Sequence, residues 1–365
     1  MSIIGNITEW LLKNSRINRL EIGSAYLRWA DGTLSQQKSA LNNLRRTHSP
    51  GLTEFSTVIS ELKSLAKVKY GIEKYVALIL SDQAFHFGAI SVPAAVSKAG
   101  VLPLIQRDIQ KNASLPFNAY AIKHENGKTR AGKLYIQYCA LPAQLQESIE
   151  QTCNAAGLVP VSVQPSFACL LRLLQKHQQP SEHASVFLHI GNENTTMGIY
   201  ESTGLNTVLL INFGVQNLIA ELVKVTGCDT ETAQNQLFKE PLLLEDPSAS
   251  QAQHEIPAFL TLEPVFASFL QQAYGQLLLY TSENPEQSGF ARITISGGGA
   301  VIKNIDRLIA YNLGISTTKI SDELKHLQQM PGLPDGETLE TLAPILGNLL
   351  LEPVQRDRFD RVMAA

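Results

Sequence analysis

Three short stretches of the chain place glycine and small polar residues directly after apolar runs, where phosphate-binding loops occur. They are Gly23 with Ser24, the segment GNENTT at 191–196, and three glycines at 297–299. Glycine lets the backbone approach phosphate oxygens, while hydroxyl and backbone N–H groups supply hydrogen-bond donors. The first two stretches are also ordinary hairpin material. Three consecutive glycines between a strand and a helix are more specific, and they favour contact with a phosphate or a flat ring.

Apolar periodicity predicts the elements that position these stretches. Two strands joined by a tight turn are predicted within 17–30, and single strands at 75–80, 85–92, 133–140, 159–163, 186–191, 195–200, 206–213 and 292–296. Helices are predicted at 55–65, 97–112, 145–153, 165–178, 218–223, 265–277 and 302–309. Asp31 and Gly32 predict a hairpin turn. Residues 240–257 are polar and predict a loop. The N-terminal stretch 1–14 is interpreted as a short helix docked on the core, with contact to a membrane surface through its apolar face as the alternative.

The predicted elements form two similar halves joined by the polar linker 178–183. Each half opens with a strand, a turn and a second strand, and continues into a helix. This repeat of pattern indicates a duplicated α/β fold. In such a fold the crevice between the halves is where a nucleotide is expected, touched by turns from both halves.

Composition excludes several classes of protein. The chain has 365 residues, a formal net charge of −3 and 17% charged residues, so no global attraction to nucleic acid is expected. Four cysteines lie too far apart for zinc or redox motifs, and they predict reduced thiols in a cytoplasmic protein. No apolar stretch reaches the length needed to span a bilayer, and no export signal precedes the first strand.

Several segments together resemble the PilM-type actin-like proteins of type IV pilus assembly, which are relatives of the cell-division protein FtsA. The segments are EIGSAYLRW, HIGNENTT, AGLVPVSVQPSFACLLRLL, ISGGGAVIKNID and TLAPILGNLL. The resemblance covers nearly the whole chain. It implies an α/β fold of the actin-like (ribonuclease H-like) type, with two lobes and an inserted α+β subdomain in the first lobe.

The resemblance also implies residue boundaries for the lobes and their subdomains. The first lobe core is expected at 1–81, 156–182 and 340–365, the inserted subdomain at 82–155, the second lobe core at 183–226 and 285–339, and a helical subdomain at 227–284.

A nucleotide cleft between the lobes is implied as well, with ATP as the cofactor. By position, Gly23, Ser24 and Arg28 line the first phosphate turn; Gly191, Asn194, Thr195 and Thr196 the second; and Gly297, Gly298 and Gly299 the adenosine side. The family further implies a cytoplasmic scaffold at the inner face of the cytoplasmic membrane. Near the inserted subdomain it receives the short N-terminal tail of an inner-membrane PilN-type partner, alongside other pilus or secretion components.

Two departures from the family pattern concern Mg²⁺. The family begins both phosphate turns with aspartates that hold the ion, whereas this chain has Glu21 and His189. Glu21 keeps the charge and is the candidate metal ligand, but imidazole is a poor ligand for a hard cation. Arg28 replaces the usual lysine, which preserves charge but not shape. Because metal-assisted phosphoryl transfer needs placed carboxylates, no catalytic residue is predicted.

The leading hypothesis is therefore a scaffold that binds nucleotide with little or no hydrolysis. An active ATPase or small-molecule kinase of the same fold is the alternative, although no catalytic aspartate is found for it. A secretion-platform domain of the GspL type is disfavoured because such proteins continue into a transmembrane helix. His189 is interpreted as structural, a zinc site with His183 as unsupported, Ser296 as no nucleophile, Asp82 as a solvated turn residue, and Asp108 as a helix-surface residue.

Overall fold

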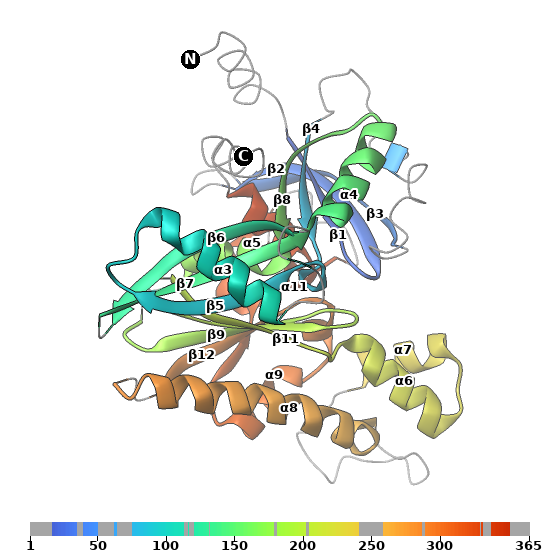
Figure 1. Ribbon diagram of the computed structural model, residues 1–365. Coiled ribbons are helices and arrows are strands. Elements are labelled where there is room, and N and C mark those ends of the chain that lie inside the picture. The colour runs from blue at the N-terminus through green and yellow to red at the C-terminus, as the bar shows by residue number, and fades with distance from the viewer. Residues whose placement is uncertain are drawn as a thin grey trace. The chain divides into compact units, whose positions relative to one another are not determined.

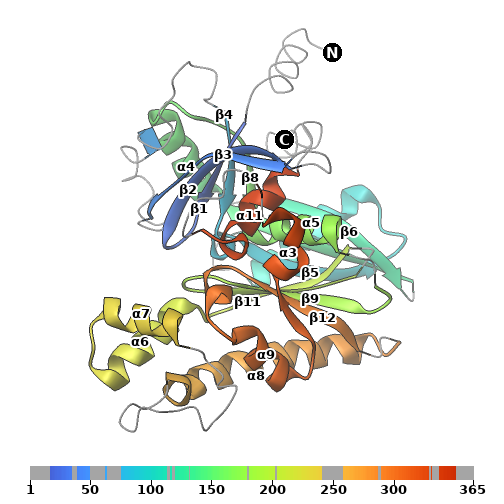
Figure 2. The same cartoon turned by 180° about the vertical axis from the view of Figure 1, so that it is seen from behind.

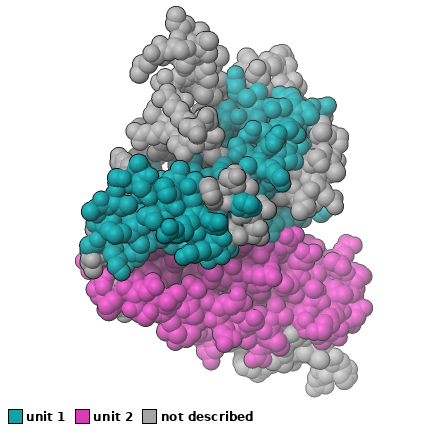
Figure 3. Space-filling view, viewed as in Figure 1, with its two compact units in different colours: residues 1–176, 329–337, 344–365 teal, residues 177–328, 338–343 magenta. Residues whose placement is uncertain are grey.

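The computed structural model of the chain divides into two compact units, which Figure 3 colours separately. Unit 1 comprises residues 1–176, 329–337 and 344–365, and unit 2 comprises residues 177–328 and 338–343. The structure describes residues 17–34, 39–49, 62–63, 75–112, 116, 120–130, 132–178, 181–201, 204–240, 258–286, 289–328, 330 and 337–350. The predicted helix at 1–14, most of that at 55–65, and nearly all of the loop at 240–257 lie outside the described residues.

Unit 1 is built around a five-stranded sheet with the strand order β3-β2-β1-β4-β8. Its strands are β1 (Asn18–Ile22), β2 (Tyr26–Leu34), β3 (Ser39–His48), β4 (Tyr75–Leu80) and β8 (Val159–Pro165). β1, β2 and β3 pair antiparallel, whereas β1, β4 and β8 run parallel (Figure 1). The predicted hairpin turn at Asp31 and Gly32 is wrong. Both residues lie inside β2, Asp31 is buried, and an irregularity in the β2–β3 register at Trp29 and Asp31 accommodates them.

Helices α4 (Ala143–Ala155) and α5 (Ser166–His177) of unit 1 confirm the predicted helical periodicity. Ile149 and Cys153 of α4 are fully buried in the core formed by strand residues such as Leu20 and Leu78. The last described helix is α11 (Leu339–Leu349), and its residues from Pro344 onward belong to unit 1. This part of α11 lies beside α5 (Figure 2), where Arg172 donates a hydrogen bond to the carbonyl oxygen of Gly347 at 3.3 Å.

A second sheet of unit 1, with the order β5-β7-β6, has a small core of its own. Its elements are β5 (His86–Pro93), α3 (Lys98–Asn112), β6 (Tyr120–Arg130) and β7 (Lys133–Pro142). Val92, Ile105 and Ile136 are among the residues that bury the contact between sheet and helix. Strand β6 escaped prediction because its sequence, YAIKHENGKTR, is largely polar. This sheet is the inserted α+β subdomain.

Unit 2 contains a five-stranded sheet with the order β11-β10-β9-β12-β13. Its strands are β9 (Ala184–Ile190), β10 (Thr195–Glu201), β11 (Gly204–Ile211), β12 (Phe290–Ser296) and β13 (Thr317–Lys319). Its main helices are α6 (Val215–Thr226), α7 (Thr230–Lys239), α8 (Ala258–Glu283) and α9 (Ile305–Leu313). Helix α8 runs along one face of the sheet (Figure 1) and buries Phe266 and Phe269 in a common core with the strands.

The two large sheets share one topology. Each begins with three antiparallel strands in chain order, and the first of these pairs in parallel with the next strand of the sheet. The duplication predicted from the sequence is therefore confirmed at the level of strand order. Among the described residues, no helix is both long and apolar enough to cross a membrane.

Candidate functional site

The glycine-rich stretches of unit 2 meet at one edge of its sheet. β9 and β12 run parallel with His189 beside Ser296, so both strands end at the same edge. Gly191 follows β9, and Gly297 follows β12. The second predicted phosphate turn and the triple-glycine segment, far apart in the sequence, are thus neighbours within one unit.

Steric packing explains why positions 297 and 299 are occupied by glycine. Gly297 has φ of +87°, which side chains disfavour, and a Cβ there would lie 2.3 Å from the carbonyl oxygen of Ile190. A Cβ at Gly299 would lie 2.2 Å from Cγ2 of Ile190. At Gly298, a Cβ would meet no atom within 4 Å, and this glycine is half-buried where its neighbours are buried. The fold of the chain therefore gives no reason for glycine at position 298.

The helix that follows the glycines starts later than predicted. A 3-10 turn spans Gly298–Val301, and α9 begins at Ile305 because Asn304 adopts a left-handed φ of 61°. Another helix begins beside the glycines instead: the N–H of Gly297 donates to the carbonyl oxygen of Glu340 in the first turn of α11, at 2.8 Å.

The turn between β9 and β10 is joined to the start of α6. The N–H groups of Val215 and Gln216 donate to the carbonyl oxygens of Gly191 and Asn192, at 3.1 and 2.8 Å. Within the turn, the N–H of Gly191 donates to the carbonyl oxygen of Asn194. These bonds fix the backbone of the hairpin relative to the helix, as a loop that presents its backbone to a ligand requires.

The two threonines after the turn are buried. The hydroxyl of Thr195 donates to the carbonyl oxygen of Phe213 at 2.7 Å, and Thr196 is 2% exposed. Thr195 therefore has a structural role at the junction of β11 and α6. The predicted contact of both threonines with phosphate stays a prediction.

His189 pairs with Ser296. Its Nδ1 lies 2.9 Å from the Ser296 hydroxyl, which joins the ends of β9 and β12. Ser296 has no solvent exposure, so it is inaccessible as a nucleophile. The pair supports the interpretation of His189 as structural.

In unit 1, the turn between β1 and β2 holds the first predicted phosphate residues. The N–H of Gly23 donates to the carbonyl oxygen of Tyr26 at 3.0 Å, and Gly23 and Ser24 are half-buried. Across the two strands Glu21 stands opposite Arg28, and Nη1 of Arg28 lies 3.2 Å from Oε2 of Glu21. Glu21, the candidate metal ligand, and Arg28, a candidate phosphate ligand, therefore form one buried ion pair.

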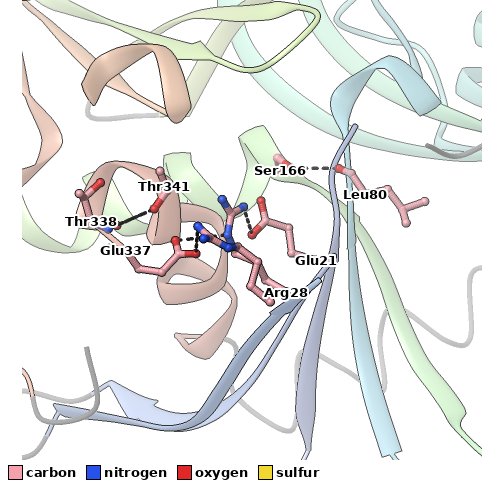
Figure 4. A network of polar contacts seen from close by, with 8 residues as sticks. Glu21, Arg28, Leu80, Ser166, Glu337, Thr338 and Thr341 are labelled. Atoms are coloured by element: carbon pink, nitrogen blue, oxygen red, sulfur yellow. Dashed lines mark hydrogen bonds and ion pairs between the residues drawn. The ribbon is translucent and has the colours of Figure 1, made fainter. Parts of the chain in front are cut away.

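A third residue, Glu337, completes this network, as Figure 4 shows. Its Oε2 lies 3.4 Å from Nε of Arg28, and its Oε1 accepts a hydrogen bond of 2.9 Å from Arg46 on β3. Neither Glu337 nor Arg46 was predicted from the sequence. No local pattern marks them, because they are 291 residues apart in the chain.

The network shifts the pKa values of Glu21 and Arg28. Burial raises the pKa of Glu21 despite the opposing charge of Arg28, and the nearby Glu337 carboxylate raises it further. For Arg28, burial lowers the pKa, but the carboxylates of Glu21 and Glu337 together outweigh it and hold the pKa above its usual value. Two carboxylates therefore share one permanently charged guanidinium.

These residues do not fit a magnesium ion. Oε2 of Glu21 is paired with Arg28, and at the second position His189 offers only a ring nitrogen, paired with Ser296, where Mg²⁺ prefers an oxygen ligand. In the part of the chain that the structure describes, no three His, Cys, Asp or Glu side chains are grouped to hold a metal. The four cysteines are free thiols, as predicted.

The raised pKa of Glu21 predicts a pH dependence of stability. Between the unfolded-state pKa of a glutamate, about 4.3, and the raised folded-state pKa, the unfolded chain ionises first. The contribution of Glu21 to the free energy of unfolding is thus full below this window and is lost as pH rises through it. We expect urea unfolding followed by circular dichroism at pH 4 to 8 to show that the wild type loses stability relative to Glu21→Gln across this window. A difference that stays constant, or grows with pH, contradicts the assignment.

The prediction for Asp82 is wrong, whereas Asp108 lies on a helix with part of its surface exposed. Asp82, predicted as solvated, is 3% exposed, and its Oδ1 accepts the N–H of Phe167 at 3.0 Å at the start of α5. Ser166 also donates to the carbonyl oxygen of Leu80 there (Figure 4). Asp108 on α3 is half-buried, and it accepts a 2.6 Å hydrogen bond from the hydroxyl of Tyr138. Both are structural acceptors.

Comparison with known proteins identifies the fold. No protein-family model matches the sequence, and the search of curated proteins finds no match. Among solved structures, the PilM–PilN type IV pilus biogenesis complex is similar with a TM-score of 0.71 and 16% identity, over 93% of this chain and 98% of that chain. MreB5 of Spiroplasma citri bound to AMPPNP gives 0.53 and 12%, over 95% and 99%. The ethanolamine utilization protein EutJ from Carboxydothermus hydrogenoformans gives 0.51 and 12%, over 92% and 89%.

The chain therefore has the actin-like fold, as the sequence predicted. The strand order repeated in units 1 and 2 and the inserted sheet of unit 1 are its elements.

Proposed function

We propose that the protein is an actin-like scaffold of a type IV pilus or related secretion machine, and that it binds the cytoplasmic tail of an inner-membrane PilN-type partner. The observation that carries the proposal is the similarity along 93% of the chain to a structure of PilM with PilN, at a TM-score well above those of the other actin-like structures named here. We propose that this scaffold acts at the cytoplasmic face of the membrane, where the partner recruits it.

We place the tail at the inserted subdomain of unit 1. One face of its sheet is covered by α3, through residues such as Val92 and Ile136. Side chains alternate along a strand, so Phe87 of β5 points to the opposite face. There its ring packs edge-on against Phe167 of α5 at 4.9 Å and stacks with Phe85 at 5.9 Å. Half-buried aromatic rings of this kind are frequent anchors for peptide partners.

The packing also suggests narrower limits for the inserted subdomain than 82–155. Asp82 holds α5, and Ile149 of α4 belongs to the core of the five-stranded sheet. We propose that the subdomain is 86–142, with its own core, and that α4 is part of the first lobe.

Nucleotide binding is the second part of the proposal. Its ligands are the residues predicted from the sequence, and Gly298 is the most informative of them because the fold does not itself demand a glycine there. MreB5, which shares the fold, has been solved with AMPPNP. We propose ATP or ADP as the ligand, with a structural role.

Hydrolysis distinguishes the scaffold from the alternative of an active ATPase or kinase. Because Glu21 and His189 are held by protein partners, we expect no phosphate release above that of a buffer control when purified protein is mixed with ATP and Mg²⁺. The measurement is continuous phosphate release, with Glu21→Gln as the matched variant. Steady turnover by the wild type that is lost in Glu21→Gln contradicts the scaffold proposal and favours the ATPase.

A further inference from the structure

Two arginines of the first sheet converge on a single carboxylate. Arg28 of β2 and Arg46 of β3 stand opposite each other in the antiparallel ladder. Each meets a different oxygen of Glu337, at 3.4 and 2.9 Å. Both guanidinium groups also lie over the ring of Tyr26, at 5.6 and 4.7 Å from its centroid. A pair of guanidinium groups held in this way matches the oxygens of a carboxylate or a phosphoryl group.

Glu337 does not use all the donors of this pair. The Nε of Arg28 is buried and makes no hydrogen bond within the described part of the chain, although Oε2 of Glu337 lies 3.4 Å away. An unsatisfied buried donor on a charged group is costly. A phosphoryl group offers three oxygens in a tetrahedral arrangement, whereas a carboxylate offers two in a plane. A phosphoryl group is therefore better suited than a carboxylate to accept a hydrogen bond from Nε of Arg28 while it also contacts both arginines.

The site is accessible from one end. The side chain of Arg28 is 11% exposed, whereas that of Arg46 is 44% exposed. An anion arriving from solvent meets Arg46 first, and Arg28 is reached only when Glu337 moves away.

We propose that Arg28 and Arg46 form a phosphoryl-binding site that Glu337 occupies in this structure, and that this arginine pair binds a phosphoryl group without a divalent cation. The proposal rests on the nucleotide binding proposed above and deepens it in two ways. The nucleotide phosphate binds without Mg²⁺, and it competes with a carboxylate of the protein itself.

Charge balance supports the competition. Glu21 and Glu337 carry two negative charges, and Arg28 and Arg46 carry two positive charges. A phosphate added to this cluster meets two carboxyl groups, and among the described residues both arginines are already paired with them. Release of Glu337 to solvent frees Arg46 and part of Arg28 for the phosphate, while Glu21 keeps its bond to Nη1 of Arg28. The neutral side chain of Glu337→Gln removes the competitor and keeps its shape.

The test uses isothermal titration calorimetry of the full chain with ADP and with inorganic pyrophosphate, each in EDTA and in Mg²⁺. We expect pyrophosphate to bind Glu337→Gln at least about tenfold more tightly than the wild type, with similar affinity in EDTA and in Mg²⁺. Arg46→Gln, a change at the more exposed end, is expected to weaken binding in the wild-type and Glu337→Gln backgrounds. Arg45→Gln, the adjacent residue whose side chain points to the other face of β3, is the matched control and leaves the affinity unchanged.

The outcomes separate this inference from the proposed function. Pyrophosphate affinity that is equal in the wild type and Glu337→Gln, or that requires Mg²⁺, overturns the inference even if ADP binds. A folded Glu337→Gln protein that fails to bind pyrophosphate also overturns the inference. So does an Arg45→Gln variant that weakens pyrophosphate binding as much as Arg46→Gln does. Binding of pyrophosphate that depends on Glu337 and Arg46, without binding of ADP, supports the anion site and removes the nucleotide from the proposed function.

Discussion

Replacing Gly297 with alanine is expected to lower the free energy of unfolding of the protein by about 2 to 4 kcal/mol. Two effects add at this position. A side chain in the left-handed region is unfavourable, and the new Cβ would lie 2.3 Å from the backbone oxygen of Ile190, which β9 holds in place. The measurement is the midpoint of urea unfolding followed by far-ultraviolet circular dichroism, where the loss appears as a lower midpoint with the same slope.

Gly298→Ala is the matched control for this change. It alters the neighbouring residue by the same methyl group, but the new Cβ meets no atom within 4 Å. We expect its unfolding free energy to stay within about 0.5 kcal/mol of the wild type. Similar losses in both variants contradict the geometry of the turn. If Gly298 contacts the nucleotide, the bulkier Gly298→Val instead weakens ADP binding in a protein that still folds.

Replacing Phe87 with alanine is expected to weaken binding of the partner's tail by about tenfold or more, which is about 1.4 kcal/mol or more of binding free energy. The change removes a half-buried aromatic ring from the cluster that joins the inserted sheet to α5 through Phe167. The measurement is fluorescence anisotropy of a labelled peptide that copies the cytoplasmic tail of the PilN-type protein of the same cell.

Leu102→Ala provides the control for tail binding. Leu102 is 42% exposed and lies on α3, which covers the other face of the same sheet. Its removal tests whether any loss of apolar surface from the subdomain weakens binding. An affinity that is unchanged in Phe87→Ala, or reduced equally in Leu102→Ala, places the tail elsewhere.

Elements with a strong apolar period were predictable from the sequence. The buried runs that became β4 and β9 follow the expected pattern, because a strand buried on both faces needs an almost continuous apolar sequence. The polar elements β6 and α7 were not predicted. Their sequences carry weak apolar periodicity, so tertiary packing decides their conformation.

The candidate site was predictable only where its residues follow strand ends. Gly191 and Gly297 were found because glycines after apolar runs are a local signal, and parallel pairing of β9 and β12 then brings them together. Glu337 and Arg46 carry no such signal, since only the folded chain shows that they share one ion pair. The burial of Asp82 was missed for the same reason: its partner is the N–H of Phe167, 85 residues away.

The most direct test of the account is a titration of the labelled tail peptide with the wild-type protein, without nucleotide or metal. A scaffold that recognises the tail through unit 1 gives saturable binding that unlabelled peptide reverses and a peptide of scrambled sequence does not. Absence of saturable binding by the folded protein, or equal binding of the scrambled peptide, contradicts the proposed function.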